Sequence, residues 1–458
     1  MIQSLSHRIA SARPGWLLAV VATLSCIPAL AVTDAERAAV YREFRTLFDA
    51  RKYQEALPLA ERLVTLTEEQ YGAADRALVN PLTNLATVAY RMKDYPTAEK
   101  NYARSVEILG ATAGNTDKQL LRPLHGLGAT YLAQKDFERA IVPLEQAVDI
   151  SRNVDGLFNI DQLEYLEPLI TGYVALGRRT EAEKEHQYAL RVIENSNGKD
   201  DPSLLGPLDR YARWLESTGR YTTARAMHAR ALTIAEKANG MTSVTTVPPL
   251  VGFARTYQLE YLNGAEEPAE SSSQEPTFGM GNMRQEAGPR LNPDGERALK
   301  QALVTIGRAK PLDHRLLGET LVALGDWYLA GASLDKGIEV YRGAWKELSE
   351  AKDTSLLGTP YQIAYKPPSA SAKRSTLDPA EADHRFVEVL FTVTREGQVK
   401  EVRAGNGDAP EALQRAVESA TKKARYRPRF ENGEPVATSD VTLREELLLK
   451  PKKEPEAK

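Results

Sequence analysis

The chain has 458 residues, of which 42% are hydrophobic and 26% are charged, and these values are typical of a soluble globular protein. This length predicts about three folding units, or one extended array with an appendage. The formal net charge of −3 argues against a general nucleic-acid binder held by counterion release. The single cysteine, Cys26, excludes a disulfide framework and a cysteine-based metal site.

Residues 1–31 have the pattern of an export signal peptide. Positive residues precede the apolar run 16–26, and Ala29-Leu30-Ala31 supplies a small-x-small cleavage site. We therefore expect cleavage near Ala31. Two alternatives are a retained membrane anchor, although a bilayer core needs about 20 apolar residues, and lipid attachment at Cys26.

The central part of the chain repeats itself every 42 residues. Three sets of residues keep one register over five units: Gly72, Gly114, Gly156, Gly198, Gly240; Ala56, Ala98, Ala140, Ala182, Ala224; and Leu82, Leu124, Leu166, Leu208, Leu250. Each glycine follows an amphipathic run and suits a left-handed residue that ends a helix. Three positions later stands Asp75, Asp117, Asn159, Asp201 or Ser243, whose side chain can cap the next helix.

Each unit is predicted to hold two antiparallel helices, helix A and then helix B. Apolar residues recur at three- and four-residue spacing in both, for example Leu82, Leu85 and Ala89 in a helix A. The repeated alanines mark the places where the helices approach most closely. Prolines recur a little inside helix A, at Pro81, Pro123, Pro207 and Pro249, where they either start or kink the helix.

Segments 81–109 and 123–150 resemble the tetratricopeptide repeat in its long, kinesin-light-chain-like form of about 42 residues. The resemblance implies a mostly α fold, an α-α superhelical solenoid. Residues 32–262 would hold repeats 1–5 and helix A of repeat 6, and residues 293–352 would end the array. The intervening stretch 263–292 is rich in Gly, Pro, Ser and Glu and is expected to be a disordered insertion.

The same resemblance implies that the stacked A helices form a concave face that binds a protein or peptide partner. Asn84 matches the asparagine that contacts the partner backbone in the family, but its equivalents here are Gly126, Pro168, Arg210 and Gly252. Further candidates for partner binding on this face are Thr83, His125, Glu167, Asp209, Arg213 and Arg255. The alternative is that each is a solvated polar residue on a helix surface.

A second, small domain is expected at 384–450, after a linker at 353–383 and before a charged tail at 451–458. Residues 384–394 alternate between apolar and polar and predict a strand, and 399–403 predict the returning strand. A short amphipathic helix around 413–420 and strands at 426–430 and 436–449 follow. The predicted order is strand, strand, helix, strand, strand.

The segments FTVTREGQVKEV (391–402) and RYRPRFENGEPV (425–436) resemble the C-terminal domain of the TonB energy-transducer family. Such a small α+β domain would leave an edge strand that can pair with an extended partner. The candidate strand begins at Val441 and includes Leu443, and it could instead pair internally or with a second copy. Arg425, Arg427 and Arg429 are predicted to share one strand face, either as an acidic-partner site or as a solvated face.

No catalytic, nucleotide-binding or metal-binding motif occurs in the sequence, so no cofactor and no metal are expected. His186 and His228 lie 42 residues apart on successive B helices and are expected on the helix surface. The sequence thus predicts a non-catalytic, periplasmic scaffold for protein or peptide partners, with no nucleic acid. The alternatives are a TonB-type energy-transducer component for outer-membrane transport, anchored in the inner membrane, and an enzyme.

Overall fold

The computed structural model describes residues 34–114, 116–264, 291–372 and 382–450. The predicted signal peptide, nearly all of the predicted insertion and the charged tail lie outside these ranges. The chain divides into two compact units, residues 1–134 and 135–458, which are described separately.

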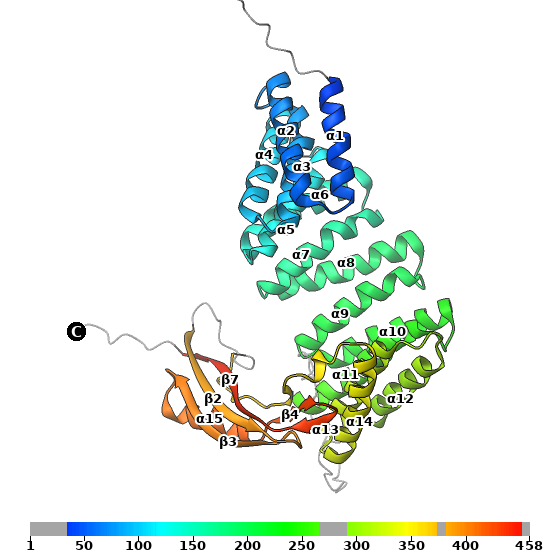
Figure 1. Ribbon diagram of the computed structural model, residues 1–458, viewed down its shortest axis with the longest axis vertical. Helices are drawn as coiled ribbons and strands as arrows, with labels where there is room; N and C mark the ends of the chain where they lie inside the picture. Colours follow the sequence, from blue (N-terminus) through cyan, green and yellow to red (C-terminus); the bar gives the residue numbers. More distant parts are fainter. Residues whose placement is uncertain (1–33, 115, 265–290, 373–381, 451–458) are drawn as a thin grey trace, which may run out of the picture. The chain divides into compact units, whose positions relative to one another are not determined.

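The first unit contains five α-helices in its described part, coloured blue to cyan in Figure 1. They are α1 (Asp34–Asp49), α2 (Tyr53–Tyr71), α3 (Val79–Arg91), α4 (Tyr95–Ala113) and α5 (Leu121–Ala133). Helices α3 and α5 occupy the predicted helix A positions, and α2 and α4 the helix B positions. Each helix packs against the next along the chain, as the repeat predicts.

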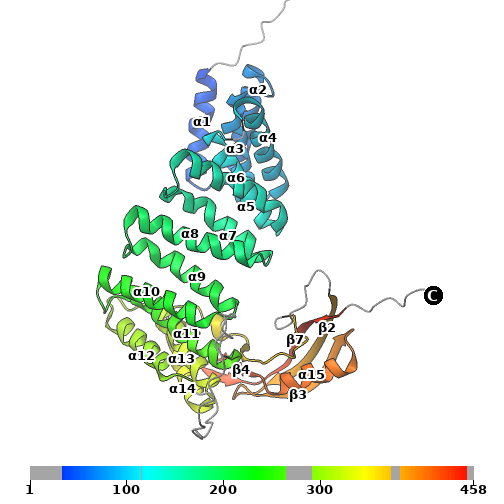
Figure 2. The same cartoon turned by 180° about the vertical axis from the view of Figure 1, so that it is seen from behind.

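The second unit continues the pattern and then adds the strands. Its helices are α6 (Phe137–Asp155), α7 (Leu163–Ala175), α8 (Arg179–Asn197), α9 (Leu205–Ser217), α10 (Tyr221–Asn239), α11 (Val247–Asn263), α12 (Pro293–Arg308), α13 (His314–Ala330) and α14 (Leu334–Glu350). Successive helices from α7 to α14 lie side by side in both views (Figures 1 and 2). Helices α7, α9, α11 and α13 are A helices.

The joints between repeats follow the predicted chemistry. Each helix A from α3 to α11 is preceded by a short 3₁₀ turn, and the predicted polar residue accepts a backbone hydrogen bond at the start of that turn, as Asp75 does from the Ala77 amide. Gly72 ends α2 with φ +92°, a conformation that disfavours residues with a Cβ. Pro81 is the third residue of α3, and the equivalent prolines sit likewise, so they start helices and do not kink them.

The repeated alanines and leucines form the cores of the two units. The five alanines, from Ala56 to Ala224, are fully buried, and the five leucines, from Leu82 to Leu250, are at most 3% exposed. Alanine at each crossing lets two helix backbones approach closely, and leucine fills the space beside it. Within each unit, the stacking of such pairs buries a core that grows by addition of repeats.

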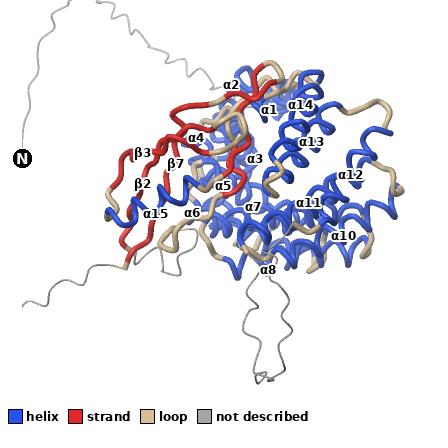
Figure 3. Tube along the Cα trace, turned by 90° about the horizontal axis from the view of Figure 1, so that it is seen from below, coloured by secondary structure: helices blue, strands red, loops and turns tan. Residues whose placement is uncertain are grey.

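The tail is a three-stranded antiparallel sheet with one helix. Strands β2 (Asp383–Val393), β3 (Val399–Gly407) and β7 (Thr438–Leu449) form the order β3-β2-β7. Helix α15 (Glu411–Lys422) packs against β2 and β3, beside which it runs in Figure 3. Val387, Val389, Phe391 and Leu447 form the core with Val417 of α15. The expected fold class, a mostly helical repeat region followed by a small α+β domain, is confirmed.

Two features of the tail differ from the sequence prediction. The expected linker contains strand β1 (Tyr361–Ala364), which pairs with β4 (Arg425–Arg427). The hairpin of β5 (Arg429–Glu431) and β6 (Glu434–Val436) packs on α14, where Phe430 joins a core with Tyr341 and Leu348. The tail therefore does not separate from the array at residue 384. The pattern of a four-residue strand is too short to stand out within a stretch rich in proline and serine.

Candidate functional site

In the first unit the structure places the predicted partner-binding residues on α3 and α5, but at different depths. Thr83 is buried, and its hydroxyl lies 3.4 Å from that of Ser105, so it belongs to the core and not to an exposed face. Asn84 and His125 are half-buried and remain on the helix A face.

In two of the later repeats, an aromatic ring of the preceding helix B occupies the space beside helix A and explains why glycine stands in place of the asparagine. A Cβ built on Gly126 would lie 2.3 Å from the Tyr102 ring, and one on Gly252 would lie 2.3 Å from the His228 ring. Each glycine thus makes room for a ring from the preceding helix B. In the repeat that keeps Asn84, the equivalent helix B residue is Ala60, which is small. The usual asparagine position is therefore closed at these two sites by packing.

In the second unit the predicted polar residues largely satisfy one another. Glu167 of α7 pairs with Arg210 of α9, which joins neighbouring A helices. Asp209 accepts a 2.8 Å hydrogen bond from Nε of Arg213, one turn away on the same helix. Arg213 is nevertheless 61% exposed, so its guanidinium is the most accessible of this set.

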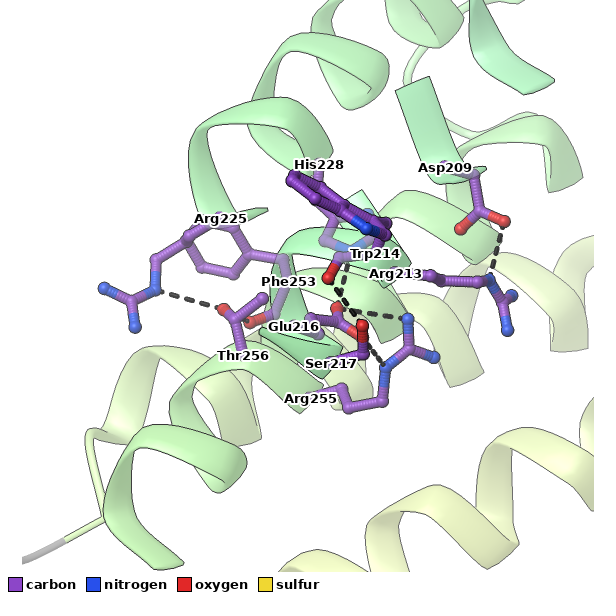
Figure 4. A network of polar contacts seen from close by, with 10 residues as sticks. All are labelled: Asp209, Arg213, Trp214, Glu216, Ser217, Arg225, His228, Phe253, Arg255 and Thr256. Carbon is purple, nitrogen blue, oxygen red and sulfur yellow. Dashed lines mark hydrogen bonds and ion pairs between the residues drawn. The ribbon is translucent and has the colours of Figure 1, made fainter. Parts of the chain in front are cut away.

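Arg255 belongs to a buried network that the sequence analysis did not foresee (Figure 4). The Glu216 carboxylate accepts hydrogen bonds from Nε of Arg255 at 2.7 Å and from Nη2 at 3.1 Å, and it lies 2.9 Å from Nε2 of His228. Burial alone would raise the pKa of Glu216, but hydrogen bonds from His228 and Arg255 outweigh burial and lower it. Glu216 therefore holds Arg255 in one orientation on α11.

The two histidines are buried, and the expectation that they lie on the helix surface is wrong. His186 stacks on Tyr211 with ring centroids 5.1 Å apart and also contacts Trp214, while His228 faces Glu216. Burial, with a contribution from nearby Arg210, lowers the pKa of His186 to about 4. Within the described ranges no three His, Cys, Asp or Glu side chains gather as a metal site would need.

The three arginines of the tail do not share a solvated face. Nη1 of Arg427 lies 3.1 Å from both carboxylate oxygens of Asp326 on α13, and Tyr341 donates to the same carboxylate at 2.6 Å. Arg427 is buried, which contradicts its assignment as a partner-binding residue. Arg429 pairs with Glu431, and Arg425 is half-buried on β4 opposite β1.

Strand β7 lies at one edge of the tail sheet, where the sequence analysis placed it. It pairs with β2 in unbroken register from Leu449 back to Val441. Val441 and Leu443 are half-buried and pack against the tail core. The other edge, β3, is irregular, because its register with β2 shifts twice and Glu401 has a positive φ.

Comparisons with known proteins agree with these two parts. The tetratricopeptide-repeat family model matches residues 45–110, 77–153 and 164–237, and the model of the Gram-negative bacterial TonB protein C-terminal domain matches residues 386–443. No curated protein matches the chain. Within the ranges that the structure describes, no helix has the length and apolar character required to cross a membrane.

The chain also resembles solved structures. A Podosopora anserina protein with nearly identical TPR-like repeats, described as kinesin-light-chain-like, is 20% identical, with a TM-score of 0.41 over 44% of this chain and 94% of that one. BtubC from P. vanneervenii is 14% identical, with a TM-score of 0.34 over 54% and 88%. A TPR protein fragment from Cytophaga hutchinsonii is 12% identical, with a TM-score of 0.41 over 69% and 97%.

Both matched domain types typically bind proteins and do not catalyse reactions, and the second indicates the Gram-negative cell envelope. The chain thus carries tetratricopeptide repeats within residues 45–237 and a TonB C-terminal domain at residues 386–443.

Proposed function

We propose that the chain is a non-catalytic scaffold of the Gram-negative periplasm that holds two protein partners. One partner binds the helix A face of the repeats, and the other adds an extended segment to the β7 edge. The observation that carries the proposal is the edge position of β7 in a TonB-type domain attached to a repeat array.

The helix A face of the second unit offers both charge and an apolar recess. Exposed Arg213 stands on α9, and a recess between α9 and α11 is lined by Leu205, Ala231 and Pro249, with Asp209 among its polar lining. An apolar side chain of the partner would enter the recess. Because Asp209 and Arg213 already pair with each other, a partner that binds them must replace that pair with its own contacts. These charges should therefore contribute more to specificity than to affinity.

Crosslinking in cells tests the first half of the proposal. Arg213→Glu should weaken the crosslinks of the repeat region to its partner, because it reverses the most accessible charge among the predicted residues of the second unit. Arg297→Glu is the matched control, since Arg297 is an exposed arginine of α12 in a similar local pair with Asp294. Equal crosslinking by the two variants, or no partner from periplasmic extract with and without the tail, would contradict the proposal.

The TonB match also favours a second candidate, an energy-transducer component of outer-membrane transport. That role requires an anchor in the inner membrane, whereas the scaffold requires export and cleavage near Ala31. Sequencing the amino terminus of the mature protein separates the two. A mature chain that begins at Val32 supports the scaffold, and a retained residue 1 supports the transducer.

A further inference from the structure

We infer that the chain's own segment Tyr365–Ala372, here called the edge strap, covers the C-terminal part of the β7 edge. It thereby limits the partner segment that can be added to β7 to about five residues, with apolar side chains at alternate positions. The inference deepens the proposed function and rests on strand addition at β7.

The edge strap pairs with the C-terminal part of β7 as an added strand would. The Ala372 amide donates to the Glu446 carbonyl at 2.8 Å, and the Leu448 amide donates to the Ala370 carbonyl at 2.9 Å. Ser371 and Leu447 form the antiparallel bridge between these bonds. The chain thus already uses this edge for strand addition, with itself as the first occupant.

Side chains of the edge strap fasten it to the tail. Ser371 is fully buried and donates a hydrogen bond to the Glu445 carboxylate, which is itself 1% exposed. Tyr365 and Ala370 pack against the tail core. The buried hydrogen bond between Ser371 and Glu445 indicates that the edge strap is packed into the tail and does not merely cross its surface.

The part of the β7 edge that the edge strap leaves uncovered has backbone groups that could pair with a partner strand. The bonds of Leu448 and Glu446 to the edge strap show that even-numbered residues of β7 direct their backbone groups away from β2. Because this direction alternates along a strand in regular register, the backbone N–H and C=O groups of Thr442 and Arg444 also point away from β2. Among the residues that the structure describes, these outward groups have no backbone partner beyond β7.

Both ends of the open edge are defined. Downstream it stops at Glu445, because the edge strap pairs with β7 from Glu446 onward. Upstream the register with β2 shifts between Phe391 and Val393, and Asp440 has φ 56°. The regular open edge is therefore Val441–Glu445, roughly 17 Å long at about 3.4 Å per residue.

The two faces beside this edge set the chemistry of the partner. Val441 and Leu443 lie on the core side and leave a half-buried apolar shelf. On the opposite face Arg444 pairs with Glu446 and stacks over the Phe386 ring at 3.8 Å. Side chains of a strand added here would lie alternately on the apolar shelf and toward solvent. The partner segment should therefore alternate between apolar and polar residues.

Hydrogen exchange on the unmodified full chain tests the edge strap directly. The Leu448 amide should exchange at least about tenfold more slowly than the outward amides of Thr442 and Arg444, because only Leu448 has an outward partner. Equal rates for the three amides would overturn the edge strap, whatever binds β7. Protection of Thr442 and Arg444 that grows with protein concentration would overturn the inference by showing a second copy as the occupant.

Two peptides test the length limit. Both alternate valine and threonine, have blocked ends and carry two C-terminal lysines, with either five or nine residues before the lysines. Ala372→Pro removes the donor to Glu446 and should release the edge strap, whereas Ala372→Val keeps that donor and is the control. The five-residue peptide should protect Thr442 and Arg444 equally in all three proteins.

The nine-residue peptide should bind the Ala372→Pro protein about tenfold more tightly than the unmodified chain, because it gains the outward groups of Glu446 and Leu448. Equal affinity of this peptide for both proteins would overturn the role of the edge strap. If neither peptide protects Thr442 and Arg444 while Leu448 remains protected, strand addition itself fails, and the edge strap is then a structural cover only. The two failures are thus distinguishable.

Discussion

At Gly252 the backbone of α11 passes directly beneath the His228 ring, and at Gly126 the backbone of α5 does the same beneath Tyr102. These exchanges of a side chain for a ring decide which positions of the helix A face a partner can reach. The packing can be tested with a single added methyl group, because a ring already fills the space that the Cβ of alanine would need.

Gly252→Ala should destabilise the protein by about 1–3 kcal/mol, although alanine in a helix is ordinarily favoured over glycine by about 1 kcal/mol. The added methyl group would meet Cε1 of His228 at 2.3 Å. The control is Gly206→Ala on α9, where the nearest atom is the flexible Arg210 side chain at 3.3 Å. Urea unfolding should show a loss for the first variant and none for the second, and equal stabilities would contradict this packing.

His186 should make the stability of the protein depend on pH. Its pKa is about 4 when folded, against 6.5 for an ordinary histidine, so the unfolded chain takes up the proton first. The contribution is present in full above pH 6.5 and is lost as the pH falls toward 4, by up to roughly 3 kcal/mol.

His186→Leu, which copies the equivalent Leu144, should flatten the stability profile between pH 6.5 and 4. Its free energy of unfolding near pH 7 should change little, because leucine keeps an apolar contact with Tyr211. Thr233→Ala, an exchange of an exposed residue of α10 that has no titratable group, is the control and should leave the slope intact. Urea unfolding at several pH values measures both, and an unchanged slope for His186→Leu would show that His186 takes up its proton in the folded protein as readily as in the unfolded chain.

Among the elements, the repeated pairs could be predicted from sequence because local patterns fix them. The 42-residue ladders gave the register, and residues such as Asp75 and Gly72 marked where helices begin and end. The site was harder to predict. Glu216 and His228 look like ordinary polar residues of a helix, and only their burial against Arg255 makes them one network.

The docking of the tail could not be predicted from local pattern. Arg427 and Asp326 are 101 residues apart, and an arginine that alternates along a strand resembles a solvated face until its partner is known. Strand β1 is too short to be recognised by its pattern, and it forms because β4 offers it a partner. Such long-range pairings depend on tertiary context that propensity does not encode.

Phe430→Ala should destabilise α13 and α14 together with the β5–β6 hairpin, by about 3–5 kcal/mol. Phe430 is 2% exposed, and its ring packs edge to face on Tyr341 at 5.8 Å and lies 6.5 Å from Trp345. Hydrogen exchange should therefore quicken in α14. Phe386→Ala, a half-buried phenylalanine on the tail sheet, is the control and should leave α14 unchanged. No change in α14 for Phe430→Ala would mean that the hairpin does not brace the array.

At the scale of the whole molecule, the Asp326 carboxylate, which is 17% exposed, joins the last repeat to the tail through the buried Arg427. Burial raises the pKa of Asp326, while Arg427 and the hydrogen bond from Tyr341 oppose that effect. The pair contributes orientation more than stability when intact, because desolvation of two charges offsets most of their attraction. Removal of one partner is different, since the other charge is then left buried and unpaired.

Asp326→Asn should therefore cost about 3–5 kcal/mol at the junction and allow the tail to open without the array. In the unmodified chain, amides of α13, α14 and β4 should exchange through one shared opening, whereas in the variant β4 should exchange well before α13. Arg342→Ala, which removes the exposed pair with Glu434, is the control and should keep the shared opening. If β4 and α13 still open together in Asp326→Asn, contacts other than the Asp326–Arg427 pair, such as those of Phe430, hold the tail on the array.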